Sequence, residues 1–565
     1  MKVVIVGGVA GGATAAARIR RLDEQAEIIV FERSGYVSYA NCGLPYYIGG
    51  TIADPEALTL QSPEGFWTRF RIDMRVRHEV TAIHPAEKKV TVRRLETGEV
   101  FEESYDELIL SPGARPTTPP LPGLDLDRLF TLRTVEDTFA IRSFIDRTHP
   151  KSVVLAGGGF IGMELAENLR ELGMEVTIVE MAPQLLAPLD QDMAAFVHAE
   201  MRKHGVNLRL STSVEGFEAD GEQVVVRLQG SEPLRADMAV LAIGVTPDTR
   251  LAKEAGLELG QRGSIVVDDR MQTSAPHIYA VGDAVQVRHF VTDQPALVAL
   301  AGPANKQGRI VADNICGGDS RYQGSQGSSV IKVFDMTTAV TGINERTARQ
   351  AGIDYDKVYL SPLNHAGYYP GGKMMTMKVL VEKGSYRLLG AQIVGYEGVD
   401  KRIDVLATAI RAGMTGLHLQ DLDLAYAPPY GSAKDPVNMA GYLIDNLARG
   451  TLKQFFLEDL DSLPRDGSVT LLDTRTPQEC KGGCVDGFVN IPLDELRDHL
   501  DELDPGKPVY VMCQSGLRSY LACRILAQKG LECYNLSGGY RLYQTVMLDQ
   551  AAAQTALPCG MEKAS

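Results

Sequence analysis

The stretch KVVIVGGVAGGATAAARIRRLDEQAEIIVFER, residues 2–33, predicts a buried strand, a glycine turn, a helix and a second strand. Gly7 allows the tight turn, and Gly12 allows the helix to pack closely on the strand. The pyrophosphate of a dinucleotide would lie at the helix N-terminus, where free N–H groups favour an anion. Glu32 ends the second strand, where an acid holds ribose hydroxyls. Val9 replaces the usual middle glycine, so an ordinary strand–helix–strand turn is the alternative.

A second stretch, SVVLAGGGFIGMELAENLRELGMEVTIVE at residues 152–180, repeats this pattern and contains all three glycines, Gly157, Gly159 and Gly162. Glu180 ends its second strand. An acid at this position accepts hydrogen bonds from a free 2′-hydroxyl and repels a 2′-phosphate, so we expect NADH rather than NADPH.

Two such turns in one chain predict two dinucleotides, and a flavin with a nicotinamide is the natural pair. The segment IYAVGDAV at residues 278–285 supports FAD, because it places Gly282 and Asp283 after a strand, where Asp283 would bind the ribityl chain. The segment LILSPGARP at residues 108–116 closes the first domain, with Gly113 in a turn.

The composition excludes several classes of protein. A chain of 565 residues is expected to form several domains. The formal net charge of -15 argues against a nucleic-acid partner, whose binding surface is usually basic. No apolar run reaches the ~18 residues of a membrane-spanning helix, and we predict a cytoplasmic protein. The eight cysteines are scattered and form no zinc pattern, so we predict no metal site.

These motifs together resemble the two-dinucleotide-binding flavoprotein disulfide reductases over residues 1–445. The resemblance implies an α/β fold with two Rossmann-like domains, for FAD and NAD, followed by an α+β dimerisation domain that forms a homodimer. The predicted parts are an FAD-binding domain at 1–115 and 251–325, an NAD-binding domain at 116–250, a dimerisation domain at 326–445, a linker at 446–465, a further α/β domain at 466–555 and a tail at 556–565.

A lone cysteine, Cys42, stands in the stretch SYANCGLPYY at residues 38–47. Gly, Leu, Pro and two Tyr residues follow it, so no disulfide forms within this stretch. The stretch resembles the single-cysteine branch of the family, which contains coenzyme A-disulfide reductases, NADH oxidases and NADH peroxidases. Such chemistry needs a thiolate, and a helix that opens after Cys42 would stabilise it. A buried, inert cysteine is the alternative.

Substrate contacts follow from the resemblance to the coenzyme A-disulfide reductases. The peroxidase-like members keep a histidine near residue 10, and this chain has none there. A family position that is basic in relatives is occupied by Phe70 here. The matching positions for a coenzyme A-like ligand are Thr14, Arg18, Arg21, Ser38 and Asn41. Asn305 and Lys306 are candidates for further contacts, and Lys434 would neutralise a ligand phosphate. For Arg18 and Arg21, a solvated helix end is the alternative.

Two tyrosine-rich stretches of the predicted dimerisation domain also resemble that family, NHAGYYPGG at 364–372 and YAPPYGSAKDPVN at 426–438. In the family, one tyrosine from each stretch reaches the active cysteine of the other subunit. The resemblance assigns these roles to Tyr369, with Tyr368 as the near alternative, and to Tyr426. A phenol there can donate a proton to a leaving thiolate.

The C-terminal region predicts a separate α/β domain. In VYVMCQSGLRSYLACRILAQKG a strand ends at Cys513, a six-residue loop runs to Arg518, and a helix is expected to begin near Ser519. The N–H groups of such a loop form an anion-binding nest. Together with Asp473 and Arg475 in LLDTRTPQE, the loop resembles a rhodanese domain, in which the cysteine carries sulfane sulfur. An inactive rhodanese fold is the alternative.

The whole chain resembles the rhodanese-fused coenzyme A-disulfide reductases. This resemblance implies NADH- and FAD-dependent reduction of persulfides or polysulfides, with Cys42 and Cys513 as reactive sulfurs and coenzyme A as ligand or substrate. One alternative is an NADH oxidase or peroxidase with a Cys42 sulfenic acid. A sulfur carrier or sensor without turnover is a third class, and the intact NADH turn argues against it.

Overall fold

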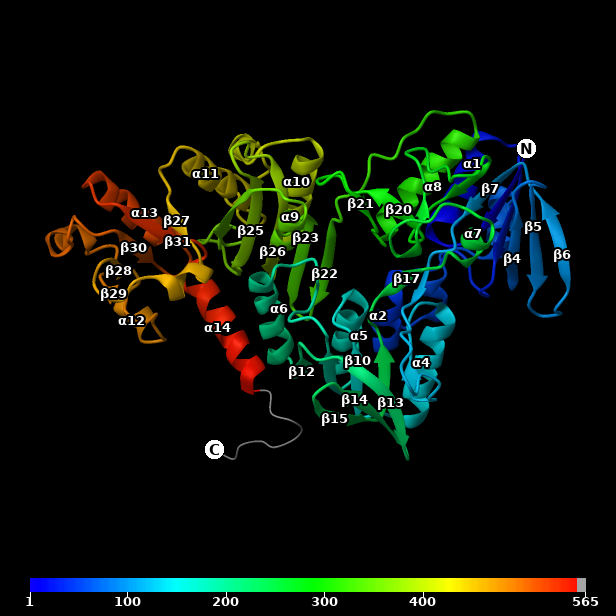
Figure 1. The fold of residues 1–565 in the computed structure, drawn as a ribbon, viewed down its shortest axis with the longest axis horizontal. Helices are drawn as coiled ribbons and strands as arrows, with labels where there is room; N and C mark the ends of the chain where they lie inside the picture. The colour runs from blue at the N-terminus through cyan, green and yellow to red at the C-terminus, as the bar shows by residue number, and fades with distance from the viewer. Residues whose placement is uncertain (556–565) are drawn as a thin grey trace. The chain divides into compact units, whose positions relative to one another are not determined.

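The computed structural model describes residues 1–555, which form two compact units (Figure 1). The first unit comprises Met1–Ala182 and Gly205–Gly327. The second comprises Pro183–His204 and the chain from Ser328 onward. The predicted tail at 556–565 lies outside the described residues. Within residues 1–555, none of the helices has the length and apolar character needed to cross a membrane.

A five-stranded parallel sheet in the order β19-β7-β1-β2-β3 forms the core of one domain in the first unit. Its strands come from both ends of this unit. They are β1 (Lys2–Val6), β2 (Glu27–Glu32), β3 (Asp73–Val76), β7 (Glu107–Leu110) and β19 (Ile278–Ala280). Helices α1 (Ala10–Leu22) and α8 (Ala301–Ile315) pack together, and a Cβ at Gly308 would lie 2.4 Å from the Gly11 carbonyl oxygen.

A second parallel sheet of the same kind has the order β12-β11-β10-β16-β9. Its strands are β9 (Leu129–Phe130), β10 (Ser152–Ala156), β11 (Glu175–Val179), β12 (Val206–Arg209) and β16 (Met238–Leu241). Helices α4 (Val135–Thr148) and α5 (Phe160–Glu171) belong to the same region. The chain enters and leaves this region through the antiparallel pair β8 (Ala114–Pro116) and β17 (Val245–Pro247).

Shorter elements complete the first unit. They are α2 (Leu44–Gly49), α3 (Pro63–Phe70), α7 (Arg250–Glu254), β4 (His78–His84), β5 (Lys89–Arg94), β6 (Val100–Ser104), β13 (Val214–Asp220), β14 (Gln223–Leu228), β15 (Ser231–Ala236), β18 (Ile265–Val266), β20 (Val285–Arg288) and β21 (Pro295–Ala296).

An antiparallel sheet in the order β22-β23-β26-β25-β24 forms one part of the second unit. Strand β26 is buried along its whole length, and β25 is buried except at Glu382, because helices cover the sheet. The elements are β22 (Ser329–Val333), β23 (Met336–Gly342), β24 (Tyr355–Leu360), β25 (Met375–Glu382), β26 (Leu388–Gly395), α6 (Gln191–Lys203), α9 (Glu345–Gln350), α10 (Val399–Arg411) and α11 (Pro436–Ala448).

A parallel sheet in the order β27-β31-β30-β28-β29 forms the other part of the second unit. Its elements are β27 (Gln454–Phe455), β28 (Thr470–Asp473), β29 (Val489–Asn490), β30 (Val509–Met512), β31 (Cys533–Leu536), α12 (Pro477–Cys480), α13 (Leu517–Gln528) and α14 (Gly539–Thr555). The segment predicted as a linker supplies β27, and Phe455, Leu460 and Leu463 join the core of this sheet. It is therefore part of the folded domain, because its apolar side chains are buried in the core of that domain.

Helix α14 lies beside α6 within the second unit (Figure 1). The fully buried His198 accepts a hydrogen bond from the Leu185 N–H at Nε2, so its Nδ1–H donates to Asp549 at 2.8 Å. Arg202 adds a second bond to the same carboxylate, at 2.5 Å. These contacts attach the last helix of the chain to α6.

A buried charge cluster lies where α6 begins. Lys378 on β25 has no exposed surface, and its ammonium bonds Glu345 at 2.5 Å, Asp190 at 2.8 Å and Asp192 at 3.1 Å. Desolvation would raise the pKa of Glu345, but the Lys378 and Lys357 charges outweigh it and hold this pKa well below its usual range. Segment 183–204 is therefore anchored to the sheet by charges that are shielded from water.

We expect Lys378→Met to destabilise the second unit by about 3–5 kcal/mol, because it leaves buried carboxylates without their counter-ion. The wild-type contribution of Glu345 is complete above its ordinary pKa of 4.5 and is lost as the pH falls, since the folded pKa is the lower one. Denaturant unfolding at pH 7 and pH 4 measures both effects. The exposed Lys383→Met is the matched control, expected within about 0.5 kcal/mol of wild type. Equal stability of the two variants would contradict this prediction.

Candidate active sites

Three predicted glycines follow strands β1, β7 and β19 at one edge of the first sheet. Gly7, Gly113 and Gly282 have φ values of 98°, 69° and 85°, a left-handed region that glycine adopts without strain. A Cβ at Gly7 would lie 2.1 Å from the Ser111 carbonyl oxygen, and one at Gly12 would lie 1.9 Å from the Gly7 carbonyl oxygen. The backbone itself therefore requires these glycines.

Asp283 lies at the same edge, but two residues that hold this region were not predicted. Arg133 donates to the Asp283 carboxylate at 2.7 Å, and Gln307 accepts a hydrogen bond from the Gly282 N–H at 2.7 Å. Both partners are distant in sequence and belong to no motif, so no local signal identifies them.

The two predicted ribose-binding acids have the same local geometry. Glu32 accepts the Gly8 N–H at 2.9 Å, and Glu180 accepts the Gly158 N–H at 2.7 Å. Each carboxylate thus holds the glycine turn that precedes its strand.

In the second glycine turn, two glycines are required by close backbone packing and the third borders open space. A Cβ at Gly162 would lie 2.1 Å from the Gly157 carbonyl oxygen, whereas one at Gly159 would have no atom within 4 Å. Gly157 and Gly162 are needed because a side chain there would collide with the backbone. At Gly159 the protein leaves open space that a bound ligand could occupy. Both turns therefore fit a dinucleotide pyrophosphate at the start of a helix.

Cys42 lies in a single helical turn, Asn41–Gly43, directly before α2, so the expected helix does open after it. The side chain is exposed on one side. Desolvation by the surrounding protein and the negative charge of Glu164 nevertheless raise the pKa of Cys42, while Arg133 acts in the opposite direction. Burial and the Glu164 charge therefore oppose ionisation of this thiol, in the direction opposite to the stabilisation expected from the helix start.

Among the acids that raise the pKa of Cys42, Glu164 on α5 has the largest effect. Desolvation raises its pKa to about 7, although the hydroxyl of Tyr46 donates a hydrogen bond to it. A carboxyl group with a pKa near neutral pH whose charge acts on a cysteine thiol is a candidate for proton exchange.

Several predicted coenzyme A contacts meet on one side of α1. Thr14 donates to Asn305 at 2.5 Å, and Arg18 pairs with Asp313 at 2.7 Å. Ser38 has a φ of 48°, unusual for a residue other than glycine, and its N–H donates to the Gly8 carbonyl. Asn41 is half-buried next to Cys42. The remaining predicted cations are exposed, namely Arg21, Lys306 and Lys434.

The two tyrosine-rich stretches contact each other through the side chains of Tyr368 and Tyr426. Their hydroxyls lie 2.7 Å apart, and the side chains are 76% and 45% exposed. Tyr369, the first choice from the sequence, instead packs edge-on against His365, with ring centroids 5.6 Å apart. The structure thus pairs Tyr426 with the alternative residue.

A buried arginine that the sequence did not indicate holds both tyrosine stretches. Arg402 on α10 is 1% exposed and donates to the Asn364 carbonyl at 2.8 Å and to the Asp435 carboxylate at 3.0 Å. The Ala366 N–H also donates to the Gly431 carbonyl. The backbone segments that carry the exposed Tyr368 and Tyr426 are therefore held together by buried hydrogen bonds.

Cys513 follows β30 and is fully buried. Its Sγ accepts hydrogen bonds from the Gly516 N–H at 3.1 Å and from the Ser519 hydroxyl at 3.2 Å. Two donors on one sulfur stabilise negative charge there. Helix α13 begins at Leu517, two residues earlier than expected, so Arg518 belongs to its first turn.

The other predicted rhodanese residues support the loop. Arg518 forms a bidentate pair with Glu479, whose pKa these bonds hold at about 2. Asp473 and Arg475 are 2% and 0% exposed and pair with each other, and Arg475 lies over the Tyr540 ring. Both side chains are buried and paired with each other inside the domain, so neither presents an exposed surface for the predicted substrate contact.

Comparison with known families agrees with this architecture. Residues 1–308 match the pyridine nucleotide-disulphide oxidoreductases, residues 328–436 match the dimerisation domain of these enzymes, and residues 456–545 match the rhodanese-like domain. The chain therefore belongs to the pyridine nucleotide-disulphide oxidoreductase family and carries a rhodanese-like domain. The predicted family and fold class are confirmed, and membership implies FAD and NAD(H) as cofactors.

Individual relatives cover most of the chain. Coenzyme A disulfide reductase of Staphylococcus aureus (strain JH9) is 38% identical over 442 residues, 78% of this chain and 99% of that protein. The structure of reduced CoADR-RHD from Bacillus anthracis is 49% identical with a TM-score of 0.95, covering 97% and 98% of the two chains. A NAD-dependent persulfide reductase from A. fulgidus is 38% identical with a TM-score of 0.90, covering 96% and 100%.

We expect Glu164→Gln to lower the pKa of Cys42, because it removes a negative charge that disfavours the thiolate. Alkylation of Cys42 by iodoacetamide at pH 7 to 8 should become several-fold faster, and its pH profile should move to lower pH. Glu171→Gln, at the exposed end of the same helix, is the matched control and should leave the profile unchanged. A profile that is identical in both variants would show that Glu164 does not act on Cys42.

Proposed function

We propose that this enzyme reduces persulfides and polysulfides with electrons from NADH, and that coenzyme A carries the substrate sulfur. The observation that carries the proposal is the presence, in one chain, of a lone Cys42 and of Cys513 in a rhodanese-like loop. A lone cysteine suits a substrate that itself brings the second sulfur. The names of the S. aureus and A. fulgidus relatives support both sulfur substrates.

The cofactors would be held by the two glycine turns. Gly7, Gly12 and Asp283 would bind FAD, and Gly157 and Glu180 would bind NADH. When bound, FAD and NADH supply the two electrons that return an oxidised sulfur at Cys42 to the thiolate.

The thiolate of Cys42 would attack the persulfide of the carrier. Attack on the carrier-bound sulfur releases HS⁻ and leaves a mixed disulfide, whereas attack on the terminal sulfur releases the carrier thiolate and leaves a Cys42 persulfide. The better leaving group, which has the lower pKa, decides between the two. Arg18, Arg21 and Lys306 would neutralise phosphates of coenzyme A.

Two tyrosines would protonate the leaving sulfur. In a homodimer, Tyr368 and Tyr426 of the partner subunit would face Cys42, as the family resemblance implies. Their mutual hydrogen bond supports a shared role, because one phenol can orient the other for proton donation.

Cys513 would take up sulfane sulfur from polysulfide and pass it to the carrier thiol. Its two hydrogen-bond donors, Gly516 and Ser519, support the thiolate that this step requires. The carrier then brings the sulfur to Cys42.

Cysteine substitutions separate the two steps. Cys42→Ser should abolish NADH-dependent sulfide release, whereas Cys513→Ser should lose polysulfide turnover and keep activity on coenzyme A persulfide. The measurement is anaerobic NADH oxidation with polysulfide, coenzyme A persulfide, coenzyme A disulfide or buffer alone, scored for sulfide and free thiol. Equal loss on polysulfide and persulfide in Cys513→Ser would contradict the relay. Turnover only on the disulfide would overturn persulfide reduction.

The tyrosine pair has a matched control next to it in the chain. Tyr368→Phe should lower kcat with coenzyme A persulfide by about 10²-fold, the range of one general acid. Tyr369→Phe removes a hydroxyl from the neighbouring residue and should change kcat less than 2-fold, roughly the effect of an uninvolved surface group. The reverse result would assign the role to Tyr369.

A second candidate function is reduction of O₂ or peroxide through a Cys42 sulfenic acid. Similarity to the water-forming NADH oxidase of Lactobacillus brevis favours it, at 29% identity and a TM-score of 0.76 over 80% of this chain and 99% of that one. Rapid NADH consumption in air without any sulfur substrate would select this function.

A further inference from the structure

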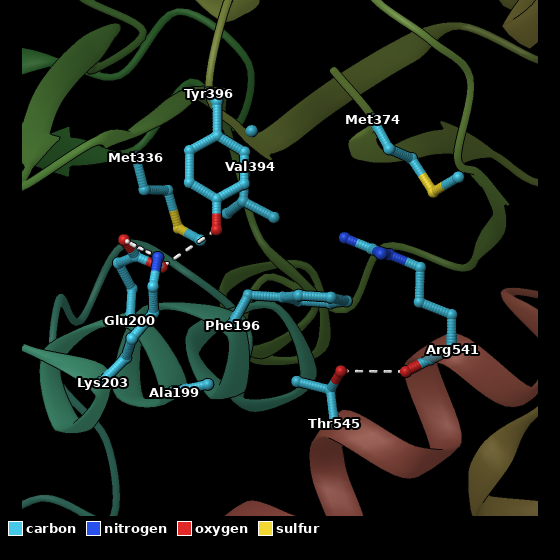
Figure 2. A pocket seen from close by; sticks show the side chains of 11 residues that line it. Phe196, Ala199, Glu200, Lys203, Met336, Met374, Val394, Tyr396, Arg541 and Thr545 are labelled. Carbon is cyan, nitrogen blue, oxygen red and sulfur yellow. Dashed lines mark hydrogen bonds and ion pairs between the residues drawn. The ribbon is translucent and has the colours of Figure 1, made fainter. Parts of the chain in front are cut away.

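A pocket of about 240 Å³ lies within the second unit, and neither Cys513 nor the tyrosine pair is among the residues that line it (Figure 2). Helix α6 contributes Phe196 and Lys203, strand β23 contributes Met336, and helix α14 contributes Arg541. No step of the proposed sulfur chemistry uses this pocket.

One side of the pocket is apolar. Met336, Met374 and Val394 come from the antiparallel sheet or its edge, and the ring of Phe196 faces them from α6 (Figure 2). Thioether side chains adapt their shape to a ligand and favour contact with apolar or aromatic groups. This wall therefore suits the carbon body of a ligand.

The carboxylate in the pocket already has its counter-charge. Glu200 accepts from Lys203 at 3.0 Å and from the Tyr396 hydroxyl at 3.0 Å. Glu200, His204 and Asp335 are close enough together to hold a metal ion, but the Lys203 ammonium lies on the same carboxylate and competes with a cation. Glu200 therefore leaves no negative charge for Arg541.

Arg541 is the other positively charged residue that lines the pocket. No carboxylate lies at ion-pair distance from it among residues 1–555. Its Nε donates a long hydrogen bond, 3.4 Å, to the Thr376 hydroxyl, and its guanidinium carbon lies 5.4 Å from the centre of the Phe196 ring. Figure 2 shows the guanidinium pointing into the pocket. Burial lowers the pKa of Arg541. Arg541 is half-buried, and a guanidinium partly shielded from water without a counter-ion costs free energy that a bound anion would offset.

We propose that this pocket binds an organic carboxylate, with its carboxylate on the Arg541 guanidinium and its apolar body against Phe196, Met336 and Met374. The planar guanidinium fork matches a carboxylate with two parallel hydrogen bonds. The ligand is therefore a small aromatic or aliphatic acid. This inference is independent of the sulfur chemistry proposed above.

The same arginine connects the pocket with the loop of Cys513. The Arg541 N–H donates to the Gln514 carbonyl at 2.9 Å, and the Tyr540 N–H donates to the Cys513 carbonyl at 2.8 Å. A ligand that holds Arg541 thus contacts the helix start on which the Cys513 loop rests.

The test uses the full-length, FAD-loaded protein with benzoate, its neutral isostere benzamide and inorganic phosphate, followed by calorimetric titration and thermal unfolding. Benzoate should bind and raise the Tm, whereas benzamide should not, and phosphate should bind at least 10-fold more weakly because it lacks the apolar body. Arg541→Gln should weaken benzoate at least 10-fold, and the exposed Arg497→Gln should leave its Kd unchanged.

Three results would overturn the proposal. They are equal binding of benzoate and benzamide, equal binding of benzoate and phosphate, and an unchanged benzoate Kd in Arg541→Gln. If Arg541→Gln does not fold, Arg541→Lys decides the question. It keeps the charge but loses the fork, so a several-fold weaker Kd is expected and an unchanged Kd contradicts the proposal.

Discussion

The close approach of backbone to backbone at the two glycine turns is the constraint on which the first unit depends. A Cβ at Gly12 or Gly162 would lie 1.9 or 2.1 Å from a carbonyl oxygen of its own turn, so any side chain would push the helix away from the sheet. With glycine, the helix N-terminus stays at the carboxyl edge of the parallel strands, where its N–H groups would face the pyrophosphate of a bound dinucleotide. The acids Glu32 and Glu180 can then bond the same turns.

In the second unit, buried charged side chains determine how the segments are positioned. Lys378 bonds three carboxylates without contact with water, and Arg402 bonds Asp435 and the backbone of both tyrosine stretches. A buried charge that loses its partner costs several kcal/mol of folding free energy. The segments joined by these pairs are therefore restricted to the arrangement in which every pair is complete. Segment 183–204 and the exposed tyrosines are thereby held in place by the buried side chains of Lys378 and Arg402.

The two candidate reactive cysteines have opposite surroundings. Cys42 is exposed, and its protein neighbours raise its pKa, chiefly through desolvation and Glu164. Cys513 is buried, and two donors bond its sulfur. The first site suits a thiol whose charge depends on bound cofactors and substrate, and the second suits a sulfur that the loop itself stabilises. A division of labour between reduction and sulfur transfer is consistent with this contrast.

The sequence by itself determined the features that depend on neighbouring residues: the glycine spacings, the acids that end the strands, the lone Cys42 and the loop from Cys513 to Arg518. Turn geometry and helix starts are local, so short motifs are enough to predict them. Only the tertiary structure decided that Tyr368 rather than Tyr369 meets Tyr426, and that β27 extends the last sheet. These facts arise from contacts between residues far apart in the chain, and the charge, burial and direction of a side chain are defined only once those contacts form.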